Sequence, residues 1–413
     1  MNTRGRFPHS PRDVFRLGPH EALAIDVVAT FFKCTGRWRY PARASGDLET
    51  MRFLDKVYWL HKSGRPIRRA ARGSGLEAFF RDQDAEALSL PERFDVECEL
   101  SVSAVGDLMS HPYLARSDGS LYQDVAELIF GADIAMANLE CVVCPAPDSP
   151  MEFTMTSGPA LVLAEEPFRV VTGFGTRKYG FVAAACNHSL DFGEEGVAST
   201  IHALRARGIA FHGINESEED ATRATILDRN GLRLGLVSYC FGLNGRRPPR
   251  HRPGIVNRLP LNAPPDRVDF SLLETQIRHC RREGVDFVIA QLHWGMEYEF
   301  YPRPEQLELA HRVAELGVDA IVGHHPHVLQ PVEYYRTRRD SARVVPVYYS
   351  LGNLTNPFSA PEVCRGGVAR LDLVKGRCDD GKTRTYLRRA HLHEIDQVID
   401  GSRDQLSLRP ARA

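Results

Sequence analysis

The sequence predicts an α/β fold with largely parallel strand pairing, and two observations lead to this expectation. Apolar or alternating segments that are typical of strands occur at residues 97–105, 134–138, 181–185, 287–292, 320–322 and 344–351. Segments of helical periodicity lie between them, at residues 194–207, 272–282 and 304–316. Strands and helices that alternate along a chain are typical of parallel α/β sheets.

The regular pattern divides the chain into three parts. Residues 1–97 are rich in arginine and proline and have only short apolar runs, so we expect an N-terminal extension or small subdomain there. Within it, residues 48–61 have the apolar spacing of a helix. Residues 98–375 carry the regular pattern and form the main domain, and residues 376–413 form a C-terminal segment.

Two features of the main domain stand apart from this alternation. Residues 225–228 and 232–239 flank an Arg-Asn-Gly turn and predict a β-hairpin. Residues 242–267 are rich in proline, arginine and asparagine and predict a long loop over the surface. The arginines of this loop could contact carboxylates or phosphates, although a solvated loop explains them about equally well; they are Arg246, Arg247, Arg250 and Arg252.

The composition is that of an ordinary globular protein. Hydrophobic residues make up 43% of the 413 residues, which is enough for a sizeable core. The formal net charge is −1, so no basic field favours nucleic acid or an anionic membrane as a partner. The nine scattered cysteines favour reduced thiols in the cytoplasm. Because no segment has the character of a signal peptide or a membrane anchor, we expect a soluble cytoplasmic chain.

Residues of the types that ligate metals follow five of the predicted strands. In chain order they are Asp107, then Asn138 with Glu140, then Asn187 with His188, then His293, and finally His324, His325 and His327. In α/β sheets, ligands bind outside the carboxyl ends of the strands. We therefore expect residues as distant in sequence as Asp107 and His327 to converge on one edge of the sheet. Each residue alone could be a turn residue, a helix cap or a core histidine, but their common placement favours a site.

The residue types suit a divalent metal centre. Carboxylates and an amide oxygen are hard ligands and imidazoles are borderline ones, so the mixture favours Mn, Fe or Zn over Ca or Mg. Two adjacent ions could lower the pKa of a shared water and hold the attacking and leaving oxygens of a displacement at phosphorus. His325 and His327 suit coordination because alternate residues of an extended segment face the same side.

Six segments resemble those of the capsule synthesis protein CapA family, also called the poly-γ-glutamate biosynthesis family. They are GDLM at 106–109, ANLE at 137–140, NHSLDFGEEG at 187–196, HWGMEYEFYPRPEQ at 293–306, GHHPHVLQPVE at 323–333 and YYSLGNL at 348–354. The resemblance covers roughly residues 101 to 374. It implies membership of the calcineurin-like metallophosphoesterase superfamily, and with it a sandwich of two β-sheets flanked by helices.

The resemblance also implies a role for each residue. The ligands of one or two divalent ions would be Asp107, Glu140, Asn187, His293, His325 and His327. His188 matches the neighbouring histidine of the superfamily and would act as a general acid. Asn138, His324 and Asn353 lie in matching segments and are assigned to substrate contacts. From its spacing, Asp191 could hydrogen-bond the His188 imidazole and keep it protonated for catalysis, or equally well cap the helix near residue 194.

The sequence departs from the superfamily pattern at two positions. Met109 stands where the first block usually has a histidine, so one ligand of one ion is missing. Cys186 replaces the first asparagine of the common Asn-Asn-His. CapA-like proteins are often anchored in a membrane, whereas no anchor is expected here.

Two functions are compatible with such a site. The first is a metal-dependent hydrolase of the phosphoesterase type, with a polyanionic or phosphoester substrate, linked to capsule or poly-γ-glutamate-type polymer synthesis. The second is a non-enzymatic accessory protein that binds a polyanionic polymer during its synthesis or export. Metal content, measured together with turnover of a phosphodiester, distinguishes the two.

Overall fold

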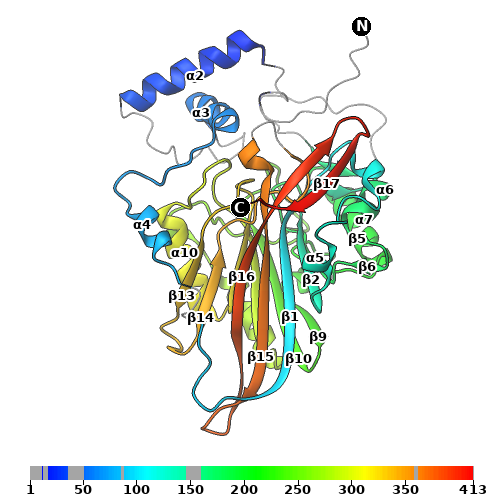
Figure 1. Cartoon of the computed structure of the whole chain (residues 1–413), viewed down its shortest axis with the longest axis vertical. Coiled ribbons are helices and arrows are strands. Elements are labelled where there is room, and N and C mark those ends of the chain that lie inside the picture. The colour runs from blue at the N-terminus through cyan, green and yellow to red at the C-terminus, as the bar shows by residue number, and fades with distance from the viewer. Residues whose placement is uncertain are drawn as a thin grey trace.

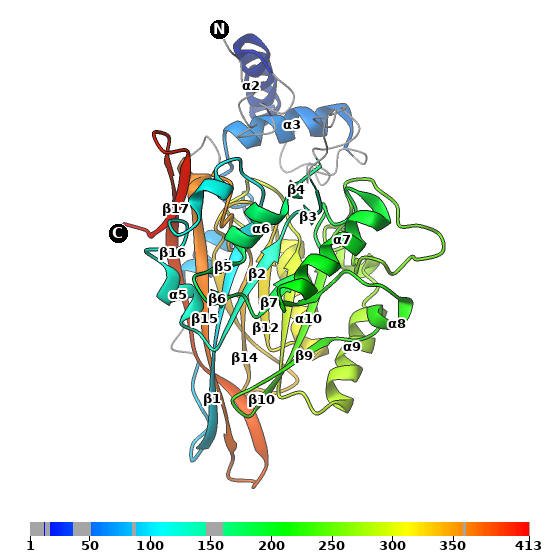
Figure 2. The ribbon, with the colours of Figure 1, turned by 90° about the vertical axis from the view of Figure 1, so that its right-hand side faces the viewer.

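Two large β-sheets lie face to face, and helices cover their outer faces (Figures 1 and 2). The computed structural model of the chain describes residues 12, 17–35, 51–84, 88–145, 160–357 and 361–412. The helices expected in the main domain are present as α7 Gly193–Ala206, α9 Ser271–Arg282 and α10 Pro304–Leu316. This arrangement confirms the predicted α/β sandwich of two sheets flanked by helices.

One sheet has seven strands in the order β17-β16-β15-β1-β2-β7-β8. Their bounds are β1 Asp95–Leu108, β2 Ile134–Leu139, β7 Phe181–Ala183, β8 Ala210–His212, β15 Arg365–Arg377, β16 Thr383–Asp400 and β17 Gln405–Pro410. Strands β1, β2, β7 and β8 pair in parallel. Strands β15, β16 and β17 pair antiparallel on the other side of β1. The expectation of largely parallel pairing is therefore wrong for this second half, because short turns join its strands and such turns produce antiparallel neighbours.

The C-terminal part of the chain belongs to this sheet. The boundary expected at residue 375 falls within β15, and β16 pairs with β15 along most of its length. Strand β17 then adds to the free edge of β16. The division of the chain into three parts stays a prediction, but residues 383–410 complete the sheet that contains β1.

The other sheet has six strands in the order β13-β14-β12-β11-β10-β9. Their bounds are β9 Thr225–Arg229, β10 Leu232–Cys240, β11 Phe287–His293, β12 Ala320–His324, β13 Val332–Arg336 and β14 Val344–Tyr348. Strands β10, β11, β12 and β14 are parallel. The hairpin of β9 and β10 is confirmed, and Asn230 and Gly231 in its turn have φ angles of 48° and 80°.

Apolar side chains fill the space between the two sheets, and they also cover the outer face of each sheet. Val102 and Leu371 of one sheet pack with Leu234 and Ile289 of the other. Helices α9 and α10 cover the outer face of the six-stranded sheet. On the outer face of the seven-stranded sheet lie α5 Ala126–Phe130 and α6 Glu165–Val171. The central strands are therefore buried on both faces, which is why they consist of nearly continuous apolar runs.

Shorter elements connect these layers. They are α8 Glu218–Ala221, the 3-10 helices η2 Leu114–Ser117, η3 Pro265–Arg267 and η4 Pro361–Cys364, and the strand pairs β3 Val142–Val143 with β4 Val162–Leu163 and β5 Gly173–Phe174 with β6 Arg177–Lys178. The segment 242–267 is not confined to the surface. Leu243, Ile255 and Val256 are buried against Val197 of α7, so the expected surface loop is wrong for these residues. Their apolar side chains bury between the polar residues that suggested a solvated loop.

The N-terminal part of the chain forms α2 Pro19–Cys34, α3 Phe53–Gly64 and α4 Leu76–Arg81. Figures 1 and 2 show α2 and α3 beyond one end of the sheets, away from the β15–β16 hairpin. The helix expected at 48–61 corresponds to α3, and residues 36–50 lie outside the described residues. Among the described residues, no helix combines the length and apolar character that crossing a membrane requires.

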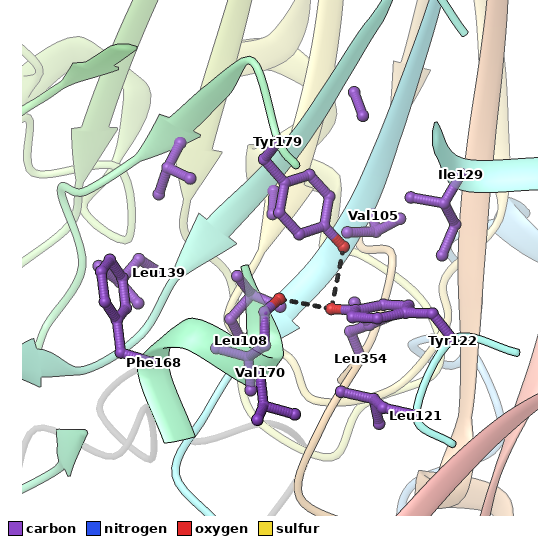
Figure 3. Close-up of a cluster of buried hydrophobic side chains, with 14 of the residues drawn as sticks. Val105, Leu108, Leu121, Tyr122, Ile129, Leu139, Phe168, Val170, Tyr179 and Leu354 are labelled. Carbon is purple, nitrogen blue, oxygen red and sulfur yellow. Dashed lines mark hydrogen bonds between the residues drawn. The ribbon is translucent and has the colours of Figure 1, made fainter. Parts of the chain in front are cut away.

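Two buried tyrosines join α6 to the seven-stranded sheet (Figure 3). Tyr122 and Tyr179 lie fully buried in a cluster with Val105 and Phe168. The Tyr122 hydroxyl donates to the Val171 carbonyl oxygen at 2.5 Å and accepts from the Tyr179 hydroxyl at 3.2 Å. Because Val171 is the last residue of α6, Tyr122 satisfies a carbonyl group that the end of the helix leaves free.

Replacing these tyrosines should show which hydroxyl matters. Tyr122→Phe leaves the Val171 carbonyl without this donor in an apolar cluster, and should lower the free energy of unfolding by about 1–3 kcal/mol. Tyr179→Phe leaves the bond from Tyr122 to Val171 intact and should cost less, about 0.5–1.5 kcal/mol. Urea denaturation of both variants measures the difference. Equal losses would contradict the role given to Tyr122.

Candidate metal centre

The expected convergence of strand ends is present, and it joins both sheets. Asp107 and Asn138 lie at the ends of β1 and β2 in the seven-stranded sheet, while His293 and His324 end β11 and β12 in the six-stranded sheet. The backbone N–H of His325 donates to Asp107 Oδ2 at 3.2 Å. The residues therefore meet at one place, as expected. They come, however, from the strand ends of two sheets, whereas the prediction placed them on one sheet.

Two glycines allow backbone segments to approach closely around the centre. A Cβ atom on Gly106 would lie 1.9 Å from the Gly352 carbonyl oxygen, and one on Gly323 would lie 2.0 Å from the Tyr349 carbonyl oxygen. A side chain does not fit at either position. In addition, the pairing of β1 with β2 shifts register just before Asp107, and such a bulge reorients the side chain that follows.

Asp107 is fully buried and is held by three neighbouring groups. Asn138 Nδ2 donates to Oδ1 at 2.9 Å, the His325 N–H donates to Oδ2 at 3.2 Å, and His324 Nδ1 lies 3.2 Å from Oδ1. Burial raises the pKa of Asp107. The hydrogen bond and charge of His324, together with His327 and the His325 backbone, outweigh burial and lower the pKa below its usual value. Asp107 is therefore an ionised carboxylate at neutral pH.

Glu140, unlike Asp107, lies in an environment that raises the pKa of its carboxyl group. It is fully buried, and no N–H or O–H group of the described residues donates to either of its carboxylate oxygens. Burial raises the pKa of Glu140 well above its usual value, and the negative charges of Asp107, Glu297 and Asp191 raise it further. A buried carboxylate without donors is unfavourable, and a cation beside it would remove that penalty. The environment of Glu140 therefore fits a bound metal ion.

Further donor atoms lie close enough to Glu140 for coordination. Three groups of described residues have donor atoms within 4.8 Å of one another: Glu140, His293 and His325; Asp107, Glu140 and His327; and Glu297, His325 and His327. Glu140 belongs to two of these groups, so it would be a ligand in either of them. The set of carboxylates and imidazoles suits Mn, Fe or Zn.

Asn187 and His293 face each other in the centre. His293 Nε2 lies 2.9 Å from Asn187 Oδ1, and His293 Nδ1 lies 3.3 Å from Asn138 Nδ2. His293 Nε2 also lies 3.6 Å from Glu140 Oε1, so it is the nitrogen that would face a bound metal ion. Burial, followed by the nearby histidines, lowers the pKa of His293 well below its usual value, so the ring is neutral, as a metal ligand must be. Asn187 Nδ2 donates to Asn244 Oδ1 at 3.2 Å, which leaves Asn187 Oδ1 facing the centre.

His325 and His327 reach the centre through a strained turn. Their φ angles are 95° and 57°, in the left-handed region that residues with a side chain rarely adopt. A hydrogen bond of 2.8 Å from the Tyr298 N–H to the Pro326 carbonyl oxygen supports this turn. The expectation that an extended segment presents both histidines is therefore wrong. The turn instead places their ring centroids 5.8 Å apart, and such strain is typical of functional sites.

His188 and Asp191 form a hydrogen-bonded pair beside these groups. His188 Nδ1 lies 2.7 Å from Asp191 Oδ2, and His188 Nε2 lies 3.4 Å from Asn244 Nδ2. Asp191 also accepts from Arg246 Nε at 3.0 Å. The N-terminus of α7 has no side-chain cap. Of the two alternatives left open for Asp191, the geometry therefore favours the bond to His188 over the helix cap.

The three residues assigned to substrate contacts are Asn138, His324 and Asn353. All three are fully buried. His324 lies between Asp107 and Gln291, with Nε2 3.1 Å from Gln291 Oε1. Asn353 Oδ1 lies 2.8 Å from His327 Nδ1. Their contact with a substrate stays a prediction, and these positions favour a different role, which is to orient Asp107 and His327.

Two residues of the centre, Glu297 and Asn244, were not expected from the strand pattern. Glu297 lies in the loop after β11, with Oε1 3.8 Å from His327 Nε2. Asn244 lies in the segment 242–267, whose polar composition suggested only a surface loop. The signal that could have indicated Glu297 is its position in HWGMEYEFYPRPEQ, one of the segments that carry the family resemblance.

A divalent ion should stabilise the folded chain, because its ligands come together only on folding. Mn²⁺ or Zn²⁺ at 100 times its Kd should raise the free energy of unfolding by about 2.7 kcal/mol, and a chelator should reverse the effect. His325→Ala should lose most of this stabilisation. His311→Ala, which alters a histidine paired with Glu333 outside the three donor groups, should retain it. Thermal unfolding with and without metal measures the shift, and a wild-type Tm independent of metal would contradict a metal centre.

A family model described as bacterial capsule synthesis protein PGA_cap matches residues 101–357. The match covers more than half of the 413-residue chain and contains every predicted ligand from Asp107 to His327. It does not include α2, α3 or α4.

Three relatives are similar over part of their length. The PGA biosynthesis protein CapA of Bacillus subtilis (strain 168) is 27% identical over 266 residues, which cover 62% of each chain. The capsule biosynthesis protein CapA of Bacillus anthracis is 30% identical over 171 residues, covering 41% of this chain and 38% of that one. A probable polyglutamine synthesis accessory protein of Mycobacterium tuberculosis (strain ATCC 25618 / H37Rv) is 28% identical over 181 residues, covering 43% and 45%. Each match spans less than two thirds of the relative. From the family match, the chain belongs to the bacterial capsule synthesis protein PGA_cap family.

Proposed function

We propose that the chain is a metal-dependent hydrolase of the phosphoesterase type, acting on a polyanionic or phosphoester substrate in capsule or poly-γ-glutamate-type polymer synthesis. The observation that carries the proposal is Glu140, a buried carboxyl group without donors among the described residues, surrounded by further metal-type ligands. The names of the relatives motivate the link to polymer synthesis. A cytoplasmic location, expected from the scattered thiols, is part of the proposal.

The pKa shifts of two proposed ligands suit a bound cation. Asp107 is ionised and His293 is neutral, as their pKa shifts indicate. The full set would be Asp107, Glu140, Asn187, His293, His325 and His327, holding one or two ions of Mn, Fe or Zn. When bound, the metal would supply Lewis-acid stabilisation of the negative charge that develops on a phosphoryl oxygen.

His188 would supply the proton that a leaving oxygen requires. Because Asp191 accepts a hydrogen bond from His188 Nδ1, that nitrogen keeps its proton. His188 Nε2 would then be the nitrogen that gains and releases a proton. Asn244 bonds to Asn187 and lies next to His188 Nε2, so Nε2 is directed toward the side of the centre where Asn187 lies. Arg246 balances the charge of Asp191 and holds the carboxylate in place.

The second candidate function is a non-enzymatic accessory protein that binds a polyanionic polymer. The name of the Mycobacterium tuberculosis relative calls that protein a probable polyglutamine synthesis accessory protein. In this chain, however, two of the four arginines of the segment 242–267 are engaged within the fold. Arg246 pairs with Asp191, and Arg252 pairs with Glu194 at 3.2 Å. These ion pairs neutralise two of the four arginine charges that a polymer would contact. They therefore favour the hydrolase over the polymer-binding accessory protein.

Separating proton donation from metal binding tests the proposal. His188→Ala should keep the bound metal and slow turnover by ~10²–10⁴-fold, the usual effect of a general acid. The loss of turnover rate should be largest for phosphodiesters with poor leaving groups. It should largely vanish for a phosphodiester whose leaving group is nitrophenolate, which needs no proton. His325→Ala should lose both metal and activity. Elemental analysis and a leaving-group series on the two variants provide the measurements.

The outcomes distinguish the two functions. If His188→Ala removes the metal as fully as His325→Ala does, His188 is a ligand and the acid role is wrong. Asp191→Asn is the companion variant to His188→Ala, because its side-chain amide can still accept a hydrogen bond from His188 but lacks the negative charge of Asp191. If metal binds but no variant changes hydrolysis above background, the accessory-protein function is the better account.

A further inference from the structure

Glu297 lies where the main domain meets the N-terminal helices. It is buried, with 6% of its surface exposed, and it follows β11 in the loop that also contains Tyr298. The Trp59 indole N–H donates to Glu297 Oε2. The other oxygen, Oε1, lies 3.8 Å from His327 Nε2. One oxygen of Glu297 is thus oriented by α3 and the other faces the proposed ligands.

We infer that Glu297 is an additional ligand of the metal centre and that Trp59 of α3 orients it. The inference rests on the proposed metal binding. Glu297, His325 and His327 have donor atoms within 4.8 Å of one another and form a group that could hold an ion. Because His325 and His327 also belong to the groups that contain Glu140, Glu297 extends the same centre.

The surrounding charges favour a ligand over an ordinary ion-pair partner. Two cationic side chains of this region, Lys62 and Arg303, both bind Glu299, at 3.0 Å and 2.9 Å. Among the described residues, the groups paired with the Glu297 carboxylate are the Trp59 indole N–H and the His327 imidazole. These partners compensate a buried carboxylate only in part, whereas a divalent cation would compensate it fully.

The N-terminal extension fixes the loop at several points. Trp59 and Lys62 are three residues apart, so they lie on one face of α3, and both are buried. After α3, the Ile67 N–H donates to the Tyr298 carbonyl oxygen at 2.8 Å, and the Phe300 N–H donates to the Ile67 carbonyl oxygen at 2.9 Å. Residues outside the family match at 101–357 therefore position a residue of the centre.

Metal binding to the purified full-length chain tests the inference. After metal is stripped, Mn²⁺ is titrated by calorimetry and by its electron paramagnetic resonance signal for wild type, Glu297→Gln, Trp59→Phe and Glu333→Gln. Glu297→Gln should lose one bound ion or weaken Mn²⁺ binding at least tenfold. Trp59→Phe removes the hydrogen bond to the ligand together with part of the buried ring, and should weaken binding by about 10–100-fold, with an altered resonance spectrum. Glu333→Gln is the matched control, because Glu333 is equally buried, binds Tyr349 and His311, and lies outside the donor groups.

Each outcome decides the inference. Wild-type Mn²⁺ stoichiometry, affinity and spectrum in Glu297→Gln would overturn it, and so would a wild-type chain that binds no Mn²⁺. If Glu297→Gln does not fold, Trp59→Phe and Glu297→Asp decide, and unchanged binding and spectra in both would overturn the inference. Phosphodiester hydrolysis is measured separately. If the wild type hydrolyses phosphodiesters and Glu297→Gln binds Mn²⁺ normally, the proposed function stands and Glu297 is not a ligand. If Glu297→Gln loses metal and the wild type does not hydrolyse phosphodiesters, Glu297 is a ligand and the proposed hydrolase function is wrong.

Discussion

The burial of several carboxyl groups among histidines at the junction of two sheets is the constraint on which the centre depends. An ionised carboxylate removed from water costs several kcal/mol unless donors or cations compensate it. Asp107 is compensated by an amide, a backbone N–H and an imidazole. Glu299 is compensated by Lys62 and Arg303. Glu140 receives no donor from the described residues, and its position fits a centre that could hold a cation.

The backbone around the centre is shaped to hold these groups. The bulge before Asp107 and the close approaches at Gly106 and Gly323 allow strand ends from both sheets to meet. The left-handed turn through His325 and His327 costs conformational energy, and the packed sheets on both sides maintain it. A rigid scaffold of this kind keeps ligands in place before a metal binds, which favours tight and selective binding.

Segments outside the regular strands complete the centre. The segment 242–267 contributes Asn244, which bonds to Asn187, and Arg246, which pairs with Asp191. The helix α3 contributes Trp59. These segments have no regular strand pattern, yet they supply partners to Asn187, Asp191 and Glu297. Conformational changes in α3 would reach the centre through the hydrogen bond from Trp59 to Glu297.

The sequence by itself indicated the alternating strands and helices, because buried strands have continuous apolar runs. It also indicated candidate ligands, because Asp107, Asn187 and His293 follow such runs directly, whereas the sandwich of two sheets was implied by the family resemblance. It did not determine the antiparallel addition of β15 to β17, because strand direction depends on which edges pair. It also missed Glu297 and Asn244, since both lie in loops several residues beyond the ends of β11 and β10. It took His325 and His327 for an extended segment, since backbone strain leaves no local pattern. Only the tertiary structure decided these features, because contacts between residues as distant as Trp59 and Glu297 depend on how the whole chain packs and not on local periodicity.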